Sequence, residues 1–279
     1  MSRSPRTARS SSAGRSTSWA TALTQIEPNR ILVRGYPLDE MMGRVGFGEA
    51  IHLMLTGEFP SPSIARLVEA MLVSFIDHGA TPPSTLAARN AATGGASLRG
   101  CVAAGVLGFG RHHGGGLLAC RQRLDEGLAL IRAGQSVHHA AAALVDRMVE
   151  ANDIPPPGFG HRVHTKDPRA ARLLQLAHQL EVEAGYSQLI RAIDLALSRH
   201  PALTDRPLPI NVDGAAAAIC GDIGFPPEVA DALLLISRIP GLAAHSLEEQ
   251  RREAPMRAID PTTHTYDGPA ERRMPDRRK

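Results

Sequence analysis

The residues best suited to chemistry in this chain are histidines and an aspartate that stand beside glycine. His161 directly follows the loop 155–160, in which three prolines stiffen the backbone and two glycines let a ligand approach the main chain. His113 is followed by three glycines, and Asp213 by a glycine and four alanines. An imidazole can donate a hydrogen bond or carry a proton near neutral pH, and apolar surroundings make a carboxylate more basic. We therefore expect acid–base chemistry at a concave site.

Three cations follow His161 within eight residues: Arg162, Lys166 and Arg169. The pair Asp167-Pro168 predicts the N-cap and first position of a helix, which places Arg169 in its first turn. A cation is unfavourable there, because the N-terminus of a helix favours anions. We therefore expect Arg169 to face an anionic ligand beside that helix end.

Each of these residues also has a plainer interpretation. Asp213 before an alanine-rich helix is, taken alone, more often an N-cap than a base. The run 112–114 could be a surface turn, and the neighbouring His112 leaves a register ambiguity of one position for the motif histidine. Single arginines are usually solvated surface charges. His161 and His164 could share a metal, but no further ligand set stands nearby, so we predict no metal site.

The composition is that of an ordinary globular protein. At 279 residues, 43% hydrophobic and 21% charged, the chain can bury one large core or two modest ones. Cys101, Cys120 and Cys220 lie in apolar, alanine-rich runs without metal-site spacing, which predicts buried thiols in a reducing, cytoplasmic compartment. No apolar run is long enough to span a bilayer, and much of the net charge of +3 lies in the two tails. We therefore predict neither a membrane nor a nucleic-acid partner.

Helical periodicity runs through the chain from Leu38 onward, without the strand–helix alternation of α/β folds, so the fold class is predicted to be all-α. Residues 31–37 before it predict a short extended piece or hairpin edge. The run 98–109, rich in small and apolar residues, is expected to form a central buried helix. Pro240 is expected to kink or break the last helix. Helices are expected near 47–55, 64–75, 84–92, 98–109, 117–133, 137–150, 168–184, 189–200, 211–221 and 227–252.

Segments in a fixed order give this chain a resemblance to the citrate synthase superfamily. They are Asp77-His78-Gly79; His113-Gly114-Gly115-Gly116; Gly158-Phe159-Gly160-His161 with Asp167-Pro168-Arg169; Asn211-Val212-Asp213-Gly214; and Arg238 seven residues before His245. The Asn-Val-Asp-Gly form and the run 241–251 look most like citryl-CoA lyases and the lyase portion of ATP-citrate lyase. That portion lacks a histidine at the motif position that His113 keeps here.

The resemblance implies an enzyme that makes or cleaves the bond between the methyl carbon of acetyl-CoA and the ketone carbon of oxaloacetate. Asp213 is implied as the base at the methyl group, His113 as the donor to the thioester oxygen, and His161 as the donor to the ketone. A coenzyme A thioester enters as a substrate, and no permanently bound cofactor is implied. The residues implied at the substrate carboxylates are His78, Arg169, Arg238 and Arg257, and those implied at the coenzyme are Gly114, Gly115, Arg162 and Lys166.

The resemblance also implies two helical lobes with the site in the cleft between them. The large lobe would comprise 22–118 and 226–270 and the small lobe 119–225, while the tails 1–21 and 271–279 are predicted to be disordered. In the family the last arginine reaches the site of the other subunit, so Arg257 implies a homodimer. The spacing from His161 to Arg169 is one residue shorter than in typical citrate synthases, which leaves open whether Arg162 or Lys166 meets the coenzyme phosphates.

Two alternatives stay open at this point. One is a synthase that acts on a different acyl-CoA, such as propionyl-CoA, to form 2-methylcitrate. The other is a non-catalytic homologue that binds an acyl-CoA or serves as a partner subunit, suggested by an N-terminal region shorter than in citrate synthases.

Overall fold

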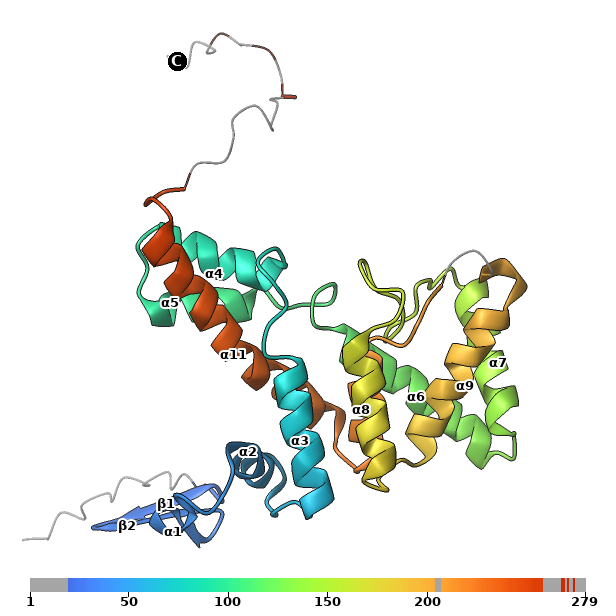
Figure 1. Ribbon diagram of the computed structural model, residues 1–279, viewed down its shortest axis with the longest axis horizontal. Helices are drawn as coiled ribbons and strands as arrows, with labels where there is room; N and C mark the ends of the chain where they lie inside the picture. Colours follow the sequence, from blue (N-terminus) through green and yellow to red (C-terminus); the bar gives the residue numbers. More distant parts are fainter. Residues whose placement is uncertain (1–19, 204–206, 258–266, 269, 271–272, 274–279) are drawn as a thin grey trace, which may run out of the picture. The chain divides into compact units, whose positions relative to one another are not determined.

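The computed structural model describes residues 20–203, 207–257, 267, 268, 270 and 273 (Figure 1). In these residues the chain forms eleven α-helices, one 3-10 turn and a single three-stranded sheet, so the all-α prediction is confirmed. It divides into two compact units, of which the first ends at Pro60 and the second begins at Ser61. The two tails predicted to be disordered lie almost wholly outside the described residues. The predicted lobe boundaries within 22–270 stay a prediction.

The first unit is a small antiparallel meander followed by two helices. Thr24 pairs with Val33, and Leu32 pairs with Pro37, so the extended piece expected at 31–37 supplies the second and third strands. Gly57 ends the last helix of this unit in the left-handed conformation, as its sequence predicts. The elements are β1 (Thr24–Glu27), β2 (Arg30–Val33), β3 (Tyr36–Pro37), α1 (Leu38–Met41) and α2 (Phe47–Thr56).

The second unit holds all the predicted site residues. Five of its helices begin at a side chain that caps the helix, namely Ser61, Ser97, Ser136, Asp167 and Asn211. The elements are α3 (Pro62–Ser74), α4 (Pro83–Thr93), α5 (Leu98–Leu107), α6 (Gly116–Arg132), α7 (Val137–Glu150), α8 (Pro168–Gln179), α9 (Gly185–Arg199), a 3-10 turn η1 (Pro201–Leu203), α10 (Val212–Asp222) and α11 (Pro227–Arg252).

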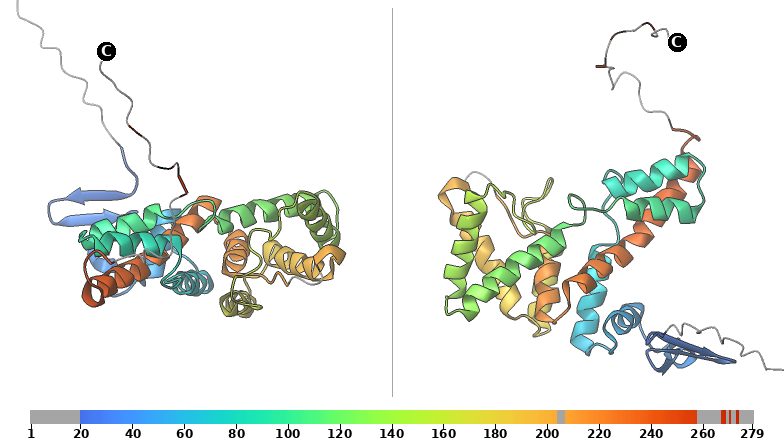
Figure 2. Two further views of the ribbon diagram at one scale, coloured as in Figure 1. Left: turned by 90° about the horizontal axis from the view of Figure 1, so that it is seen from above. Right: turned by 180° about the vertical axis from the view of Figure 1, so that it is seen from behind.

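Two groups of helices make up this second unit. Helices α4 and α5 pack on each other and on α11, and the three lie together in every view (Figure 1; Figure 2). In the other group α10 is the central element, since it contacts α6, α8 and α9, while α7 packs on α9. The alanines 215–218 of α10 are fully buried, and their small side chains let the three neighbouring helices approach closely.

The prediction of a central buried helix at 98–109 is wrong. Leu98 is 38% exposed and Leu107 is 84% exposed, and only Cys101 and Gly105 of α5 are buried. The small residues of α5 serve close packing on one side alone: a Cβ at Gly105 would lie within 3.1 Å of Leu242 and of the Ser84 carbonyl. The helix buried on all sides is α10.

The prediction for Pro240 is also corrected in part, because α11 continues through Pro240 without a break. All three cysteines are buried and free, as their sequence contexts predict. Among the described residues, no helix combines the length and apolarity needed to cross a lipid bilayer.

Candidate active site

Backbone pairing joins the loop before His161 to the segment before α10. The N–H of Gly160 donates to Pro209 over 2.8 Å, and the N–H of Asn211 donates to the Gly158 carbonyl over 3.0 Å. The Asn211 side chain adds a third bond, from Nδ2 to the Gly160 carbonyl at 3.0 Å. This pairing fixes His161 beside the start of the helix that carries Asp213.

Gly158 has no room for a side chain, because here the loop presses against α6 and α10. Its φ is +85°, and a Cβ would meet the sulfur of Cys120 and come within 2.9 Å of the Gly214 Cα. A Cβ at Gly214 would in turn meet the Gly158 carbonyl. Gly158 and Gly214 therefore allow close contact between segments of the chain itself.

Asp167 ties α8 to α10. Its side chain is buried; Oδ1 accepts from the Arg169 N–H and Nε at 3.0 Å each, and Oδ2 accepts from Arg169 Nη2 at 2.9 Å and from the Val212 N–H at 3.0 Å. Burial alone would raise the pKa of Asp167, but the hydrogen bonds and charge of Arg169 hold it below its ordinary value. The N-cap role was predicted from the sequence, whereas the bond to Val212 was not.

Asp213 occupies the first turn of α10 and is not its cap. The N-cap is Asn211, whose Oδ1 accepts from the Gly214 N–H at 3.1 Å, so the plainer interpretation of Asp213 is wrong. Its Oδ2 lies against the first residue of α6, since a Cβ at Gly116 would be 2.6 Å away. Burial raises the pKa of Asp213 to about 6, against the opposing charges of Arg169 and Arg238. A carboxylate with that pKa is suited to accept a proton near neutral pH.

His113 is held by a tight turn and by one side chain that was not predicted. Its backbone pairs with Gly110 in both directions, at 2.9 and 3.0 Å. Its ring stacks on Phe109, with centroids 4.8 Å apart, and its Nε2 lies 2.7 Å from Ser84 Oγ. The sequence predicts Ser84 only as the start of a helix, and nothing in its local sequence points to His113. Burial, then the charges of Arg238 and Arg162, lower the pKa of His113, which favours the neutral ring.

His78 and Arg238 lie beside His113. The rings of His78 and His113 are 6.4 Å apart, and the Arg238 guanidinium lies 5.8 Å from the centre of the Phe109 ring. Burial, followed by the charges of Arg238, Arg169, His113 and His161, lowers the pKa of His78 to about 4. These cationic and imidazole groups are thus close enough to act on one another.

Arg238 carries a nitrogen that is ready for a ligand. Its Nε donates to the Phe75 carbonyl at 2.8 Å, whereas its buried Nη1 has no hydrogen-bond partner among the described residues. A buried guanidinium nitrogen without a partner costs free energy, and an incoming carboxylate would remove that cost.

His161 has one ring nitrogen already occupied. Its Nδ1 accepts from the N–H groups of Val163 and His164, at 3.0 and 3.1 Å. The neutral ring must then carry its proton on Nε2, which leaves Nε2–H as a hydrogen-bond donor. Burial, and next the neighbouring His164, lower the pKa of His161, while Asp167 acts in the opposite direction.

The remaining predicted residues are less closely held in the site. Arg162 and Lys166 are exposed on the loop after His161. Gly114, with φ +89°, lies against the Phe109 ring, and Gly115 lies against the backbone of Arg111. Arg257 is not joined to the group by any contact among the described residues. Its Nε pairs with Glu249 at 2.7 Å instead.

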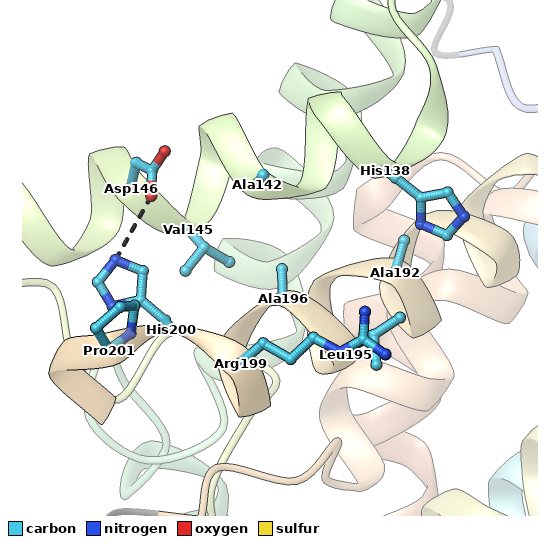
Figure 3. Close-up of a pocket in the computed structure, with 10 residues that line it drawn as sticks. All are labelled: His138, Ala142, Val145, Asp146, Ala192, Leu195, Ala196, Arg199, His200 and Pro201. Carbon is cyan, nitrogen blue, oxygen red and sulfur yellow. Dashed lines mark ion pairs between the residues drawn. The ribbon is translucent and has the colours of Figure 1, made fainter. Parts of the chain in front are cut away.

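Hollows on the described part of the second unit differ in whether the predicted site residues line them. One, of about 690 Å³, lies between α3 and α8 and is lined in part by Arg169. Another, of about 520 Å³, lies between α7 and α9 and contains an ion pair of His200 with Asp146 at 3.5 Å (Figure 3). None of the predicted site residues lines the second hollow, so we place the candidate active site at the cluster of His78, His113, His161, Arg169, Asp213 and Arg238.

A family comparison covers the part of the chain that carries this cluster. The sequence model described as "Citrate synthase, C-terminal domain" matches residues 54–259, which is more than half of the chain. The chain belongs to the citrate synthase family. Every residue of the cluster lies within the matched range.

Individual relatives differ in how much of their length this chain covers. A citrate synthase-like protein of Phoma sp. is 31% identical over 197 residues, which is 69% of this chain and 40% of that protein. The chain thus spans less than half the length of this curated relative. The structure of citryl-CoA lyase from Hydrogenobacter thermophilus matches with a TM-score of 0.82 and 38% identity, over 92% of this chain and 97% of that one.

A third comparison concerns the fold alone. ATP citrate lyase of Methanosaeta concilii, solved as a mutant in complex with (3S)-citryl-CoA, matches with a TM-score of 0.74 and 19% identity. The match covers 91% of this chain and 42% of that one.

Proposed function

We propose that this protein cleaves citryl-CoA to acetyl-CoA and oxaloacetate, and catalyses the reverse condensation. The observation that carries the proposal is a buried Asp213, with a pKa of about 6, in one cluster with two neutral imidazoles and two arginines. A match over nearly the full length of a citryl-CoA lyase favours cleavage over a reaction that ends in thioester hydrolysis.

In the condensing direction Asp213 removes a proton from the methyl group of acetyl-CoA. His113 stabilises the enolate oxygen through its ring N–H, with Ser84 holding the opposite nitrogen. The enolate carbon attacks the ketone carbon of oxaloacetate, whose oxygen takes the proton of His161 Nε2–H and becomes the hydroxyl of citryl-CoA. His161 regains a proton from solvent, and Asp213 releases the one it took. In cleavage the steps run backwards: the hydroxyl proton leaves through His161 Nε2, the electron pair of the broken carbon–carbon bond becomes the enolate, and protonated Asp213 returns a proton to carbon.

The other predicted site residues divide between the two substrates. We assign Arg169, Arg238 and His78 to the carboxylates of the oxoacid, because the unpaired Nη1 of Arg238 fits a carboxylate oxygen. Arg162 and Lys166 are assigned to the coenzyme phosphates, supported by their exposure on the loop after His161, with Gly114 and Gly115 against the coenzyme. Coenzyme A enters as part of a substrate rather than as a resident group.

We also propose a homodimer in which Arg257 serves the site of the second copy. Two observations support it. Arg257 does not contact the cluster of its own chain among the described residues. Helix α5 is apolar in sequence yet exposes Leu98 and Leu107, and a second copy would cover such a face.

The deciding experiment incubates the purified protein with synthetic citryl-CoA and follows acetyl-CoA, oxaloacetate, citrate and free thiol separately. Equal amounts of acetyl-CoA and oxaloacetate without free thiol are expected. For Asp213→Asn we expect the rate to fall by about two to four orders of magnitude with binding retained. Citrate and free thiol as products would show a hydrolysing synthase instead. If citryl-CoA binds but is not converted, the protein would be the non-catalytic homologue that binds an acyl-CoA.

Exchange of the acetyl-CoA methyl protons in deuterated water tests the role of Asp213 separately. Oxaloacetate or an unreactive analogue is present to occupy the oxoacid site. Wild type is expected to exchange and Asp213→Asn to show background only. Equal exchange in both proteins, with coenzyme shown to be bound, would refute the assignment of the base.

A further inference from the structure

A carboxylate outside the cluster is completely enclosed between two arginines. The side chain of Glu249, on the last turns of α11, has no solvent exposure. Its Oε2 accepts from Arg89 Nε on α4 at 2.7 Å, and its Oε1 accepts from Arg257 Nε at 2.7 Å. A buried charge is retained only when it is paired and hydrogen-bonded, and both conditions are met here.

Backbone hydrogen bonds to α4 fix the chain around Arg257. The N–H of Met256 donates to the Thr93 carbonyl at 2.9 Å, and the N–H of Arg257 donates to Thr93 Oγ1 at 2.8 Å. Arg257 is therefore held through its backbone by α4 and through Nε by Glu249. Its two Nη groups make no hydrogen bond to any described residue, and its side chain is 35% exposed.

The charges of this group do not balance. Two guanidinium groups face one carboxylate, so one positive charge is left over. Both arginines use only Nε among the described residues, and Arg257, at 35% exposed against 20% for Arg89, is the more accessible to a ligand. A guanidinium that donates through Nε to one carboxylate can still offer its Nη groups to a second. The arrangement thus suits an anion that arrives from outside the chain.

We propose that Glu249 is a positioning residue: by binding Nε of Arg257 it aims the Nη groups at a substrate carboxylate in the site of the second copy. This inference rests on the proposed homodimer and on the proposed role of Arg257. Arg89 secures the opposite oxygen of Glu249, so that the carboxylate cannot turn away.

Hybrid dimers separate this role from a general structural one. In the reference hybrid, one chain carries Asp213→Asn and the other carries Arg257→Ala. Its one complete site then takes Asp213 from the second chain and Arg257 from the first. Adding Glu249→Gln to the first chain is expected to raise the KM for oxaloacetate in the condensing direction about tenfold, with kcat changed less than about twofold. Adding it to the second chain is expected to change neither.

The matched control is Glu253→Gln on the first chain, an exposed glutamate four residues further on, which is expected to leave the KM unchanged. If Glu249→Gln prevents assembly, Glu249→Asp keeps the charge but shortens the reach, and we expect the same rise in KM from the chain that donates Arg257. Equal effects from either chain, or a loss of kcat alone, would overturn the positioning role.

Different results would refute the role of Arg257 across the dimer and the positioning role of Glu249. A reference hybrid that forms but shows no more activity than its parent variants together would refute the role of Arg257 across the dimer, and the positioning role with it. Recovery in the reference hybrid that does not depend on Glu249 would refute the positioning role alone.

Discussion

Replacing Asp213 by asparagine is expected to make the fold more stable while it removes activity. The site keeps this carboxylate where burial disfavours its charged form, which raises its pKa from 3.8 to about 6. Asparagine has nearly the same size and no charge, and the cap of α10 is supplied by Asn211, so the substitution removes the penalty without removing a cap.

The size of the effect follows from the two pKa values. At pH 7 a shift from 3.8 to about 6 corresponds to about 3 kcal/mol of lost stability in the wild type. The folded state binds this proton more tightly than the unfolded chain does. Stability therefore falls as pH rises from about 4 to about 6 and is level above that range. The advantage of Asp213→Asn should shrink to about 1.6 kcal/mol at pH 5 and to about 0.6 kcal/mol at pH 4.

Urea unfolding of wild type and Asp213→Asn at pH 7, 5 and 4 measures these differences directly. Asp39→Asn is the control, because Asp39 is exposed on α1 and its replacement removes no buried charge. An Asp213→Asn protein that is less stable than wild type at pH 7, or a difference that does not shrink at lower pH, would refute the reasoning that burial raises this pKa.

Three shorter predictions concern the cluster. The rate of methyl proton exchange should fall about tenfold per pH unit below about pH 6, and an oxoacid analogue should move this midpoint upward; exchange in deuterated water across pH 5–8 measures both. Ser84→Ala frees Nε2 of His113, and should slow exchange about tenfold with oxaloacetate affinity unchanged by calorimetry; reduced affinity would contradict it. Asn211→Ala removes a cap and the bond to Gly160, and should cost about 1–2 kcal/mol in urea unfolding; an unchanged midpoint would contradict it.

Local signals account for what could be predicted of the fold. The bounds of α7 and α11 were predicted at both ends, because Ser136 and the proline at 227 mark their starts and their periodicity is continuous. The content of small residues could not distinguish α5, which is partly exposed, from α10, which is buried on all sides. Both runs are apolar and rich in alanine or glycine, and only the packing of distant helices decides which one is enclosed.

The candidate site likewise has residues that were predicted from the sequence and contacts that were not. The motif residues were found because histidine, glycine and aspartate at fixed spacing carry a family signal in the sequence. The contacts that hold them were not predicted, because they join residues far apart in the chain: Ser84 with His113, and Asp167 with Val212. No local pattern encodes such a pairing, which exists only after the helices have packed.

The ion pair of Asp167 with Arg169 at the start of α8 favours the proposed role of Asp213 as a base. An unpaired Arg169 beside it would lower its pKa strongly, but the fork of Arg169 is already engaged by Asp167, whose own charge acts to raise the pKa of Asp213. Arg169 and Arg238 still lower the pKa to some degree. An oxoacid whose carboxylates neutralise these two cations would reduce that effect and make Asp213 more basic. Binding of the oxoacid would thus prepare the base for the thioester, and so the midpoint of exchange is expected to rise when an analogue is bound.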